Sequence, residues 1–101
     1  MVLERASIRI SPGREEEFET AFASAKAVVA AATGFVSATL SRGVESPSTY
    51  LLLVEWQTLE DHTEGFRGSP AFGEWRSLIG HLFDGPPDVE HFVQVAAVPA
   101  G

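Results

Sequence analysis

His62 is the residue whose type and position are best suited to acid–base chemistry. It follows the apolar segment 49–56, in a stretch where Leu59, His62 and Phe66 recur at helical spacing. An imidazole partly covered by such a helix can accept a proton near neutral pH. The same spacing also fits a packed histidine that bonds to backbone or water. Both interpretations are open, and we expect His62 to face a cleft between this helix and the sheet.

Arg76 and His91 are further candidates from other parts of the chain. Arg76 follows Trp75 on the inward face of a predicted helix, where its guanidinium can hold a substrate oxyanion or phenolate. The alternative is a salt bridge to one of the fourteen acidic residues. His91 lies between Val89 and Val93 on one face of a predicted strand, which fits either a structural role or a contact with substrate.

Aromatic side chains near these candidates indicate a pocket for a small planar or apolar ligand. Large aromatics at helical spacing belong to the core by default, yet they also make suitable pocket walls. We expect four of them to contact a substrate: Trp56, Phe66, Phe72 and Trp75.

The sequence contains no motif for a metal or a bound cofactor. It has no cysteine, no glycine-rich nucleotide motif, no HExxH and no two histidines at helical ligand spacing. A metal site built from His62, His91 and a carboxylate is geometrically conceivable, but it lacks the ligand spacing of known sites. We therefore predict neither a metal nor a cofactor.

Alternating and helical apolar patterns predict four strands and three helices. Ser11 is expected to cap the first helix with Pro12 in its first turn, and Gly34 to end it. Thr58 is expected to cap the short second helix, and Ser69 the third. The predicted elements are strand 2–10, helix 12–32, strands 35–44 and 49–56, helices 59–66 and 70–83, and strand 88–96.

This order, β-α-β-β-α-α-β, predicts one α+β domain over residues 1–101. The sheet would be ferredoxin-like and antiparallel, with its helices on one face. A chain of this size has no second layer for the other face. We therefore expect a homodimer that packs two sheets face to face, with the apolar tail 96–101 across the partner.

The charge balance limits the classes of partner. Seven Lys and Arg against fourteen Asp and Glu give a net charge of −7, which leaves no basic surface for nucleic acid or anionic membranes. No signal-peptide pattern opens the chain, and no apolar segment approaches the ~18 residues of a membrane span. We predict a cytoplasmic protein with no nucleic-acid or membrane partner.

Four short segments carry a family resemblance: Glu55-Trp56, Leu59–His62, Phe66–Phe72 and Pro87–Phe92. In these segments, and in its element order, the chain resembles the antibiotic biosynthesis monooxygenase (ABM-like) family of the dimeric α+β barrels. The resemblance covers essentially the whole chain. It implies a dimer, and a range of activities that includes cofactor-free oxygenation of aromatic polyketides, quinol oxidation, haem breakdown and signal-molecule processing.

Two departures from the family pattern bear on the chemistry. Many relatives have His where Phe66 stands, so that imidazole is absent here. The haem-degrading branch has Asn, Trp and His approximately at Ala6, Phe66 and Arg76. None of the three is kept, which argues against haem degradation.

The resemblance and the candidate residues together favour a cofactor-independent monooxygenase that acts on a planar, electron-rich phenol or quinol. In this hypothesis His62 is the base and Arg76 stabilises the substrate anion, which itself reduces O₂. The alternative is a non-oxidative or non-enzymatic dimeric domain that binds a small apolar ligand. Convergence of His62, Arg76 and Trp75 on one enclosed pocket would favour the first hypothesis.

Overall fold

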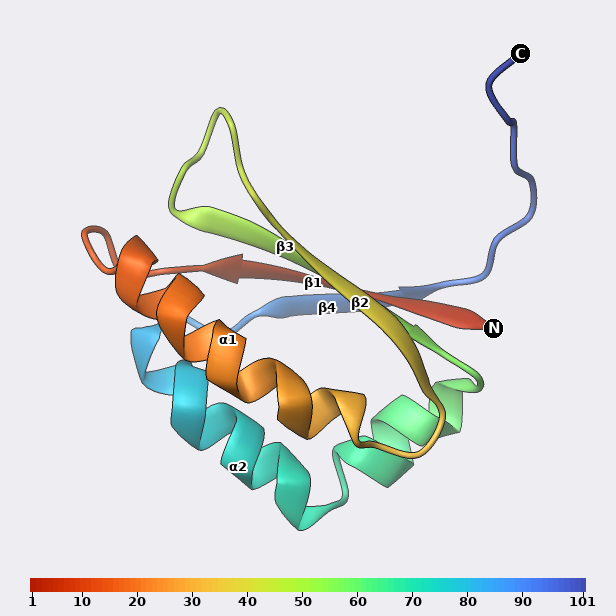
Figure 1. Cartoon of the computed structure of the whole chain (residues 1–101), viewed down its shortest axis with the longest axis horizontal. Coiled ribbons are helices and arrows are strands. Elements are labelled where there is room, and N and C mark those ends of the chain that lie inside the picture. Colours follow the sequence, from red (N-terminus) through yellow and green to blue (C-terminus); the bar gives the residue numbers. More distant parts are fainter.

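The computed structural model describes residues 1–101 and has the predicted order of strands and helices (Figure 1). Two main helices and two short ones accompany four strands. The elements are β1 (Val2–Arg9), α1 (Glu15–Ala30), β2 (Phe35–Arg42), β3 (Thr49–Trp56), the π-helical turn η1 (Asp61–Phe66), α2 (Pro70–Ile79), the 3₁₀ turn η2 (Gly80–Leu82) and β4 (Asp88–Phe92).

The four strands form one antiparallel sheet in the order β2-β3-β1-β4. Ala6 in β1 pairs with Leu52 in β3 on one side and with Val89 in β4 on the other. The helices cover a single face of this sheet, as Figure 1 shows. The predicted α+β, ferredoxin-like fold is therefore confirmed, including the central position of β3 that its two apolar faces indicate.

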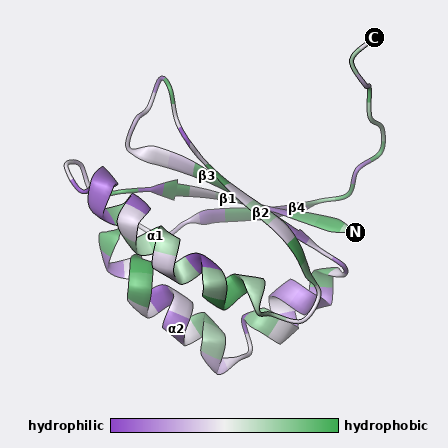
Figure 2. Ribbon diagram, in the orientation of Figure 1, coloured by the Kyte–Doolittle hydropathy of each residue, from purple (hydrophilic) through white to green (hydrophobic).

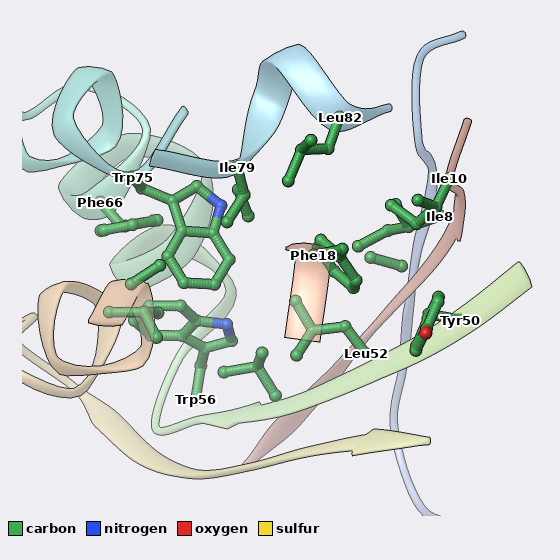
Figure 3. Close-up of a cluster of buried hydrophobic side chains, with 14 residues drawn as sticks. Ile8, Ile10, Phe18, Tyr50, Leu52, Trp56, Phe66, Trp75, Ile79 and Leu82 are labelled. Atoms are coloured by element: carbon green, nitrogen blue, oxygen red, sulfur yellow. The ribbon is translucent and has the colours of Figure 1, made fainter. Parts of the chain in front are cut away.

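The core lies between this face of the sheet and the helices. Fourteen buried apolar residues form one cluster, drawn in Figure 3. Phe18 of α1 meets the ring of Tyr50 of β3 edge to face, with 4.8 Å between centroids. Trp56, Phe66 and Trp75 gather at the opposite end of the cluster (Figure 3). The aromatic end of the core is thus the end at which β3 runs into η1.

One predicted helix start and one predicted helix cap need correction. Helix α1 begins at Glu15 rather than Pro12, because Gly13 has a φ of +89°, which a right-handed helix excludes. Glu15 opens a strongly hydrophilic first turn, visible in Figure 2, and acidic side chains there complement the helix dipole. Ser69 does stand before Pro70 at the start of α2, but its Oγ donates to the carbonyl oxygen of Phe66 instead of capping the helix.

The predicted end of the first helix also differs. Helix α1 ends at Ala30 with Ala31 as its C-cap, so Gly34 has the expected left-handed φ of +82° but lies in the chain reversal before β2 rather than at the helix end. The cap predicted at Thr58 is confirmed. The Oγ1 of Thr58 accepts a hydrogen bond from the backbone N–H of Asp61 at 3.1 Å. This bond fixes the start of the turn that carries His62.

The last strand is shorter than predicted. It ends at Phe92 rather than residue 96, because β1 supplies pairing partners only as far as Leu3, opposite Phe92. Val93 and Val95 are 70% and 97% exposed, and the chain from there to its end extends away from the sheet (Figure 1). None of the helices combines the length and the apolar character needed to cross a membrane.

The sheet face without helices carries both apolar and charged side chains. Leu51 and Phe92 are 36% and 45% exposed there. Arg5, on the same face by strand alternation, bonds to Asp88 at 3.3 Å and also to Glu90. The face is therefore less uniformly apolar than expected, and its burial against a second copy stays a prediction.

Candidate functional site

A cavity of about 480 Å³ opens between the sheet, η1 and α2. It is lined mainly by apolar side chains, with a few polar groups among them. Five of the seven predicted site residues line it: His62, Phe66, Phe72, Trp75 and Arg76. The other two, Trp56 and His91, do not line the cavity but contact His62.

The local structure of η1 aims His62 at this cavity. The backbone N–H of Arg67 donates to the carbonyl oxygen of His62 at 3.0 Å, an i→i+5 bond that widens the turn into a π-helix. His62 is 3% exposed, and its ring stacks on Trp56 with centroids 5.3 Å apart and planes 22° apart. The helical stripe that predicts an inward His62 is confirmed for His62 and Phe66, whereas Leu59 is 39% exposed.

Three polar side chains surround the His62 ring and form a network with it. Nδ1 of His62 lies 2.8 Å from Nε2 of His91. Nε2 of His62 lies 3.2 Å from Oε1 of Glu4, and the same oxygen accepts a hydrogen bond from Nε1 of Trp56 at 3.0 Å. Glu4 is itself only 7% exposed. Both ring nitrogens of His62 are therefore occupied by protein partners.

One arrangement of protons satisfies every contact in this network when Glu4 is ionised. A carboxylate only accepts, so Trp56 Nε1 donates to Glu4 Oε1, and a proton on His62 Nε2 suits its 3.2 Å approach to the same oxygen. Nδ1 of His62 is then an acceptor and receives the Nε2–H of His91. The hydrogen-bond partners thus select the Nε2–H tautomer of a neutral His62.

Burial shifts the proton affinities of these groups in opposite directions. It raises the pKa of Glu4, while the hydrogen bond from Trp56 and the charge of Arg67 act to lower it. Burial, followed by the positive charges of Arg67 and His91, lowers the pKa of His62 to about 4. Burial and Arg67 also lower the pKa of His91. At neutral pH the contact between His62 and Glu4 therefore brings a neutral imidazole against the carboxylate and is not an ion pair.

Two arginines stand at the mouth of the cavity. Arg76 and Arg67 both line it and are both exposed, and neither forms an ion pair. The guanidinium carbon of Arg76 lies 5.9 Å from the ring centroid of Phe72. With Glu4 ionised and His62 neutral, the charged side chains that line the cavity sum to one net positive charge. This balance favours an anionic ligand or an anionic intermediate.

The aromatic walls serve the core and the cavity at once. Phe66 meets Phe72 and Trp75 edge to face, at centroid distances of 5.7 and 6.2 Å. Trp75 is 8% exposed and Phe66 4%, so each shows only a small part of its side chain to the cavity. Trp56 is fully buried and acts on His62 and Glu4 rather than on a ligand.

Two residues of the site were not among the predicted ones. Glu4 has a sequence signal, because it alternates in phase with Ala6 and Ile8 on the buried face of β1. A carboxylate on an apolar strand face needs a partner, which marks it as a candidate. Arg67 lies in a turn where a solvated or capping side chain is expected, and nothing in the sequence indicates its place at the cavity.

Comparison with known proteins assigns the chain to a family. The sequence profile of the family described as "Antibiotic biosynthesis monooxygenase" matches residues 1–78. The chain belongs to the antibiotic biosynthesis monooxygenase family. Protein YczJ of Bacillus subtilis (strain 168), described as uncharacterized, is 47% identical over 95 residues, which are 94% of this chain and all of YczJ. The resemblance seen in the sequence is thereby confirmed.

Solved structures of similar proteins agree with this assignment. A protein of Bordetella bronchiseptica assigned to the same family is 41% identical, with a TM-score of 0.91 over 94% of this chain and 97% of its own. SnoaB of Streptomyces nogalater, described as a cofactor-independent oxygenase, is 22% identical, with a TM-score of 0.83 over 98% and 97% of the two chains. A monooxygenase of Streptomyces coelicolor in complex with the ligand nanaomycin D is 17% identical, with a TM-score of 0.83 over 99% and 92%. The last two likenesses show the shared fold.

Proposed function

We propose that this protein is a cofactor-independent monooxygenase that acts on a small, planar, electron-rich phenol or quinol. The observation that carries the proposal is the convergence of a proton-accepting pair, Glu4 and His62, with Arg76 on one cavity that has aromatic walls. Membership of the family supports the reaction class. The description of the similarly folded SnoaB as cofactor-independent supports the absence of a bound redox group.

The chemistry requires only groups that the cavity presents. The Glu4–His62 pair removes a proton from an acidic C–H or O–H bond, and the electron pair of that bond stays on the substrate. Arg76, at the mouth, stabilises the resulting anion. The anion reduces O₂, one oxygen atom enters the substrate, and the other leaves as water. The substrate supplies all the electrons, so no cofactor enters the balance.

The size and walls of the cavity support an aromatic substrate. About 480 Å³ is within the range of small-molecule sites, and ten of the fifteen lining residues are hydrophobic. The aromatic side chains of Phe66 and Trp75 in the cavity wall suit contact with a planar ring. The alternative, a non-enzymatic domain for a small apolar ligand, would not need the buried carboxylate or the unpaired arginines.

The experiment is oxygen consumption with a panel of anthrones, dihydroquinones and simple phenols, with product identification by mass spectrometry. The expected result is O₂ uptake with incorporation of one ¹⁸O atom from ¹⁸O₂. Arg76→Gln is expected to lower kcat/KM by about 10-fold or more, since the anion loses its cation. Tight binding of the panel without oxygen uptake would support the non-enzymatic alternative instead.

The proposal includes a homodimer, because exposed apolar groups cluster where β1 begins and β4 ends. A groove of about 610 Å³ there is lined by Met1, Leu3, Phe92 and Val93 with parts of the tail. A second copy that covers this region and the open sheet face would bury well over ~1,000 Å² in total. Sedimentation at micromolar concentration should give a dimer, and a monomer would contradict this part of the proposal. The cytoplasmic location also stays a prediction.

A further inference from the structure

The carboxylate of Glu4 has one oxygen held by the protein and one oxygen without a partner. Oε1 receives the N–H of Trp56 at 3.0 Å and lies 3.2 Å from Nε2 of His62, whereas no hydrogen bond reaches Oε2. Every side-chain nitrogen or oxygen that is fully enclosed in this protein has a hydrogen-bond partner. Since Oε2 has none, it is not fully enclosed and retains some exposure. Glu4 lines the 480 Å³ cavity, which is the space from which a ligand can approach its carboxylate.

His62 lacks such a free atom. Its Nδ1 is 2.8 Å from His91 and its Nε2 is 3.2 Å from Glu4, so it must break one of these contacts before it can meet a substrate proton. Stacking on Trp56 also holds the ring in its plane. The lone pairs that a substrate can reach without rearrangement are therefore those of Glu4 Oε2.

We infer that Glu4 is the general base of this site, with Oε2 as the accepting atom, and that His62 and Trp56 are positioning residues that clamp Oε1. The inference rests on the proposed function and narrows its proton-accepting pair to one atom. It departs from the expectation that His62 takes the proton. The supporting geometry is the hydrogen bond from Trp56 and the 3.2 Å approach of His62 Nε2, both at one oxygen of a carboxylate that is 7% exposed.

The proton step and its return balance without any added reductant. A substrate C–H bond breaks, its electron pair stays on carbon, and the proton forms an O–H bond at Glu4 Oε2. The carbanion reduces O₂ to a carbon-bound peroxide, and Glu4 returns its proton to the terminal oxygen. Loss of water from this hydroperoxide leaves a carbonyl on the substrate and the carboxylate of Glu4. One O₂ is consumed, with one oxygen atom in the product and one in water.

The surroundings of Glu4 suit a base that works near neutral pH. Charged or titratable groups face it from three directions: His62 on η1, Arg67 just after η1, and His91 on β4 behind His62. Burial raises the pKa of Glu4, which strengthens the carboxylate as a proton acceptor. The Trp56 bond and Arg67 oppose that rise, which favours the ionised form that a base requires.

The test measures proton abstraction apart from oxygenation. Anthrone is incubated with the full-length protein in D₂O under argon, and exchange of its methylene hydrogens is followed by proton NMR. Glu4→Gln, which keeps the shape but not the basicity, is expected to lower the protein-catalysed exchange rate by about 100-fold or more. His62→Gln, which leaves the carboxylate in place, should lower it by about 10-fold or less. Glu64→Gln, an exposed acid on η1, is the matched control and should exchange at the wild-type rate.

A second variant guards against misfolding of Glu4→Gln. Glu4→Ala opens space beside the cavity, and added formate should restore exchange by serving as an external carboxylate. Exchange by Glu4→Gln within about threefold of wild type would overturn the inference. Absence of exchange in the wild type would also overturn it. A third contradicting result is an exchange rate as low in His62→Gln as in Glu4→Gln, together with no rescue of Glu4→Ala by formate.

Oxygen uptake by the same proteins separates the two proposals. Exchange by the wild type that depends on Glu4, without O₂ uptake, would support Glu4 as the base and refute the monooxygenase function. Uptake of O₂ that Glu4→Gln leaves unchanged would support the monooxygenase and refute the role of Glu4.

Discussion

Replacing His62 with Gln should make the stability of the protein less sensitive to acid. The pKa of His62 falls from its ordinary 6.5 to about 4, first through burial and then through the charges of Arg67 and His91. A lowered pKa means that the unfolded chain binds the proton more tightly than the folded one. The contribution of neutral His62 is therefore fully present above about pH 6.5 and is lost as the pH falls toward 4.

The size of the effect follows from this window. It spans about 2.5 pH units, and each unit over which only the unfolded chain is protonated lowers the free energy of unfolding by about 1.4 kcal/mol. The upper limit is thus about 3.4 kcal/mol. His62 faces an open cavity and lies 3.2 Å from Glu4, whose carboxylate favours a protonated imidazole, so we reduce the expected loss to about 2 kcal/mol.

Glu4 acts with the opposite sign. Its pKa is raised in the folded protein, so its protonation at low pH favours the folded state over the unfolded one. Glu4 is present in both the wild type and His62→Gln, and its contribution cancels to first order when the two are compared. The difference between the two proteins therefore isolates His62.

Urea unfolding at several pH values between 7 and 4 measures this difference. The free energy of unfolding of the wild type should fall by about 2 kcal/mol more than that of His62→Gln over this range. His81→Gln is the control for loss of an exposed histidine that lies outside the network around His62. Parallel curves for His62→Gln and the wild type would refute the reasoning, because they would show that His62 titrates alike in both states.

Three further predictions concern the mouth of the cavity, the chain reversal before β2 and helix α2. At the mouth of the cavity, naphthoate should bind more tightly than uncharged naphthalene methanol. Arg76→Gln and Arg67→Gln should each weaken naphthoate binding about 3- to 10-fold, whereas the control Lys26→Gln should not. Equal affinity of the wild type for the two probes in isothermal calorimetry would contradict the charge argument. Gly34→Ala should lower stability by about 1 kcal/mol or more, because φ is +82° there and an added Cβ would collide with a neighbouring side chain of η1. A Gly34→Ala protein as stable as the wild type in urea would refute the backbone constraint at position 34. Gly73→Ala, in α2 with open space around the added Cβ, should raise the free energy of unfolding by about 0.5–1 kcal/mol.

The fold could be predicted from the sequence because its signals are local. Alternation marks β1 and β3, and Gly34 and Pro70 mark helix boundaries within a few residues of their places in the structure. The boundary errors come from contacts that are not local. The end of β4 at Phe92 depends on where β1 stops offering partners, and that is a property of the strand register.

The candidate site was predictable only in part, for the same reason. His62, Trp75 and Arg76 could be placed from helical stripes that converge on one sheet face. The bond between Glu4 and Trp56 joins residues fifty-two positions apart, and it exists only because β1 and β3 pair side by side. Which residue contacts His62 therefore depends on how the strands pair in the sheet, and no single segment of the sequence indicates it.

The position of Glu4 is difficult to explain by stability alone. It stands on a strand face whose other members, Ala6 and Ile8, are 3% exposed and apolar, and burial raises its pKa. A buried carboxylate destabilises a fold even when it is hydrogen-bonded, and an apolar residue of similar size at position 4 would pack there with less cost. Local violations of an otherwise consistent pattern tend to concentrate at functional sites. Glu4 combines that violation with a carboxylate oxygen that no hydrogen bond reaches, and this combination distinguishes it from His62, whose ring nitrogens both lie close to a protein partner.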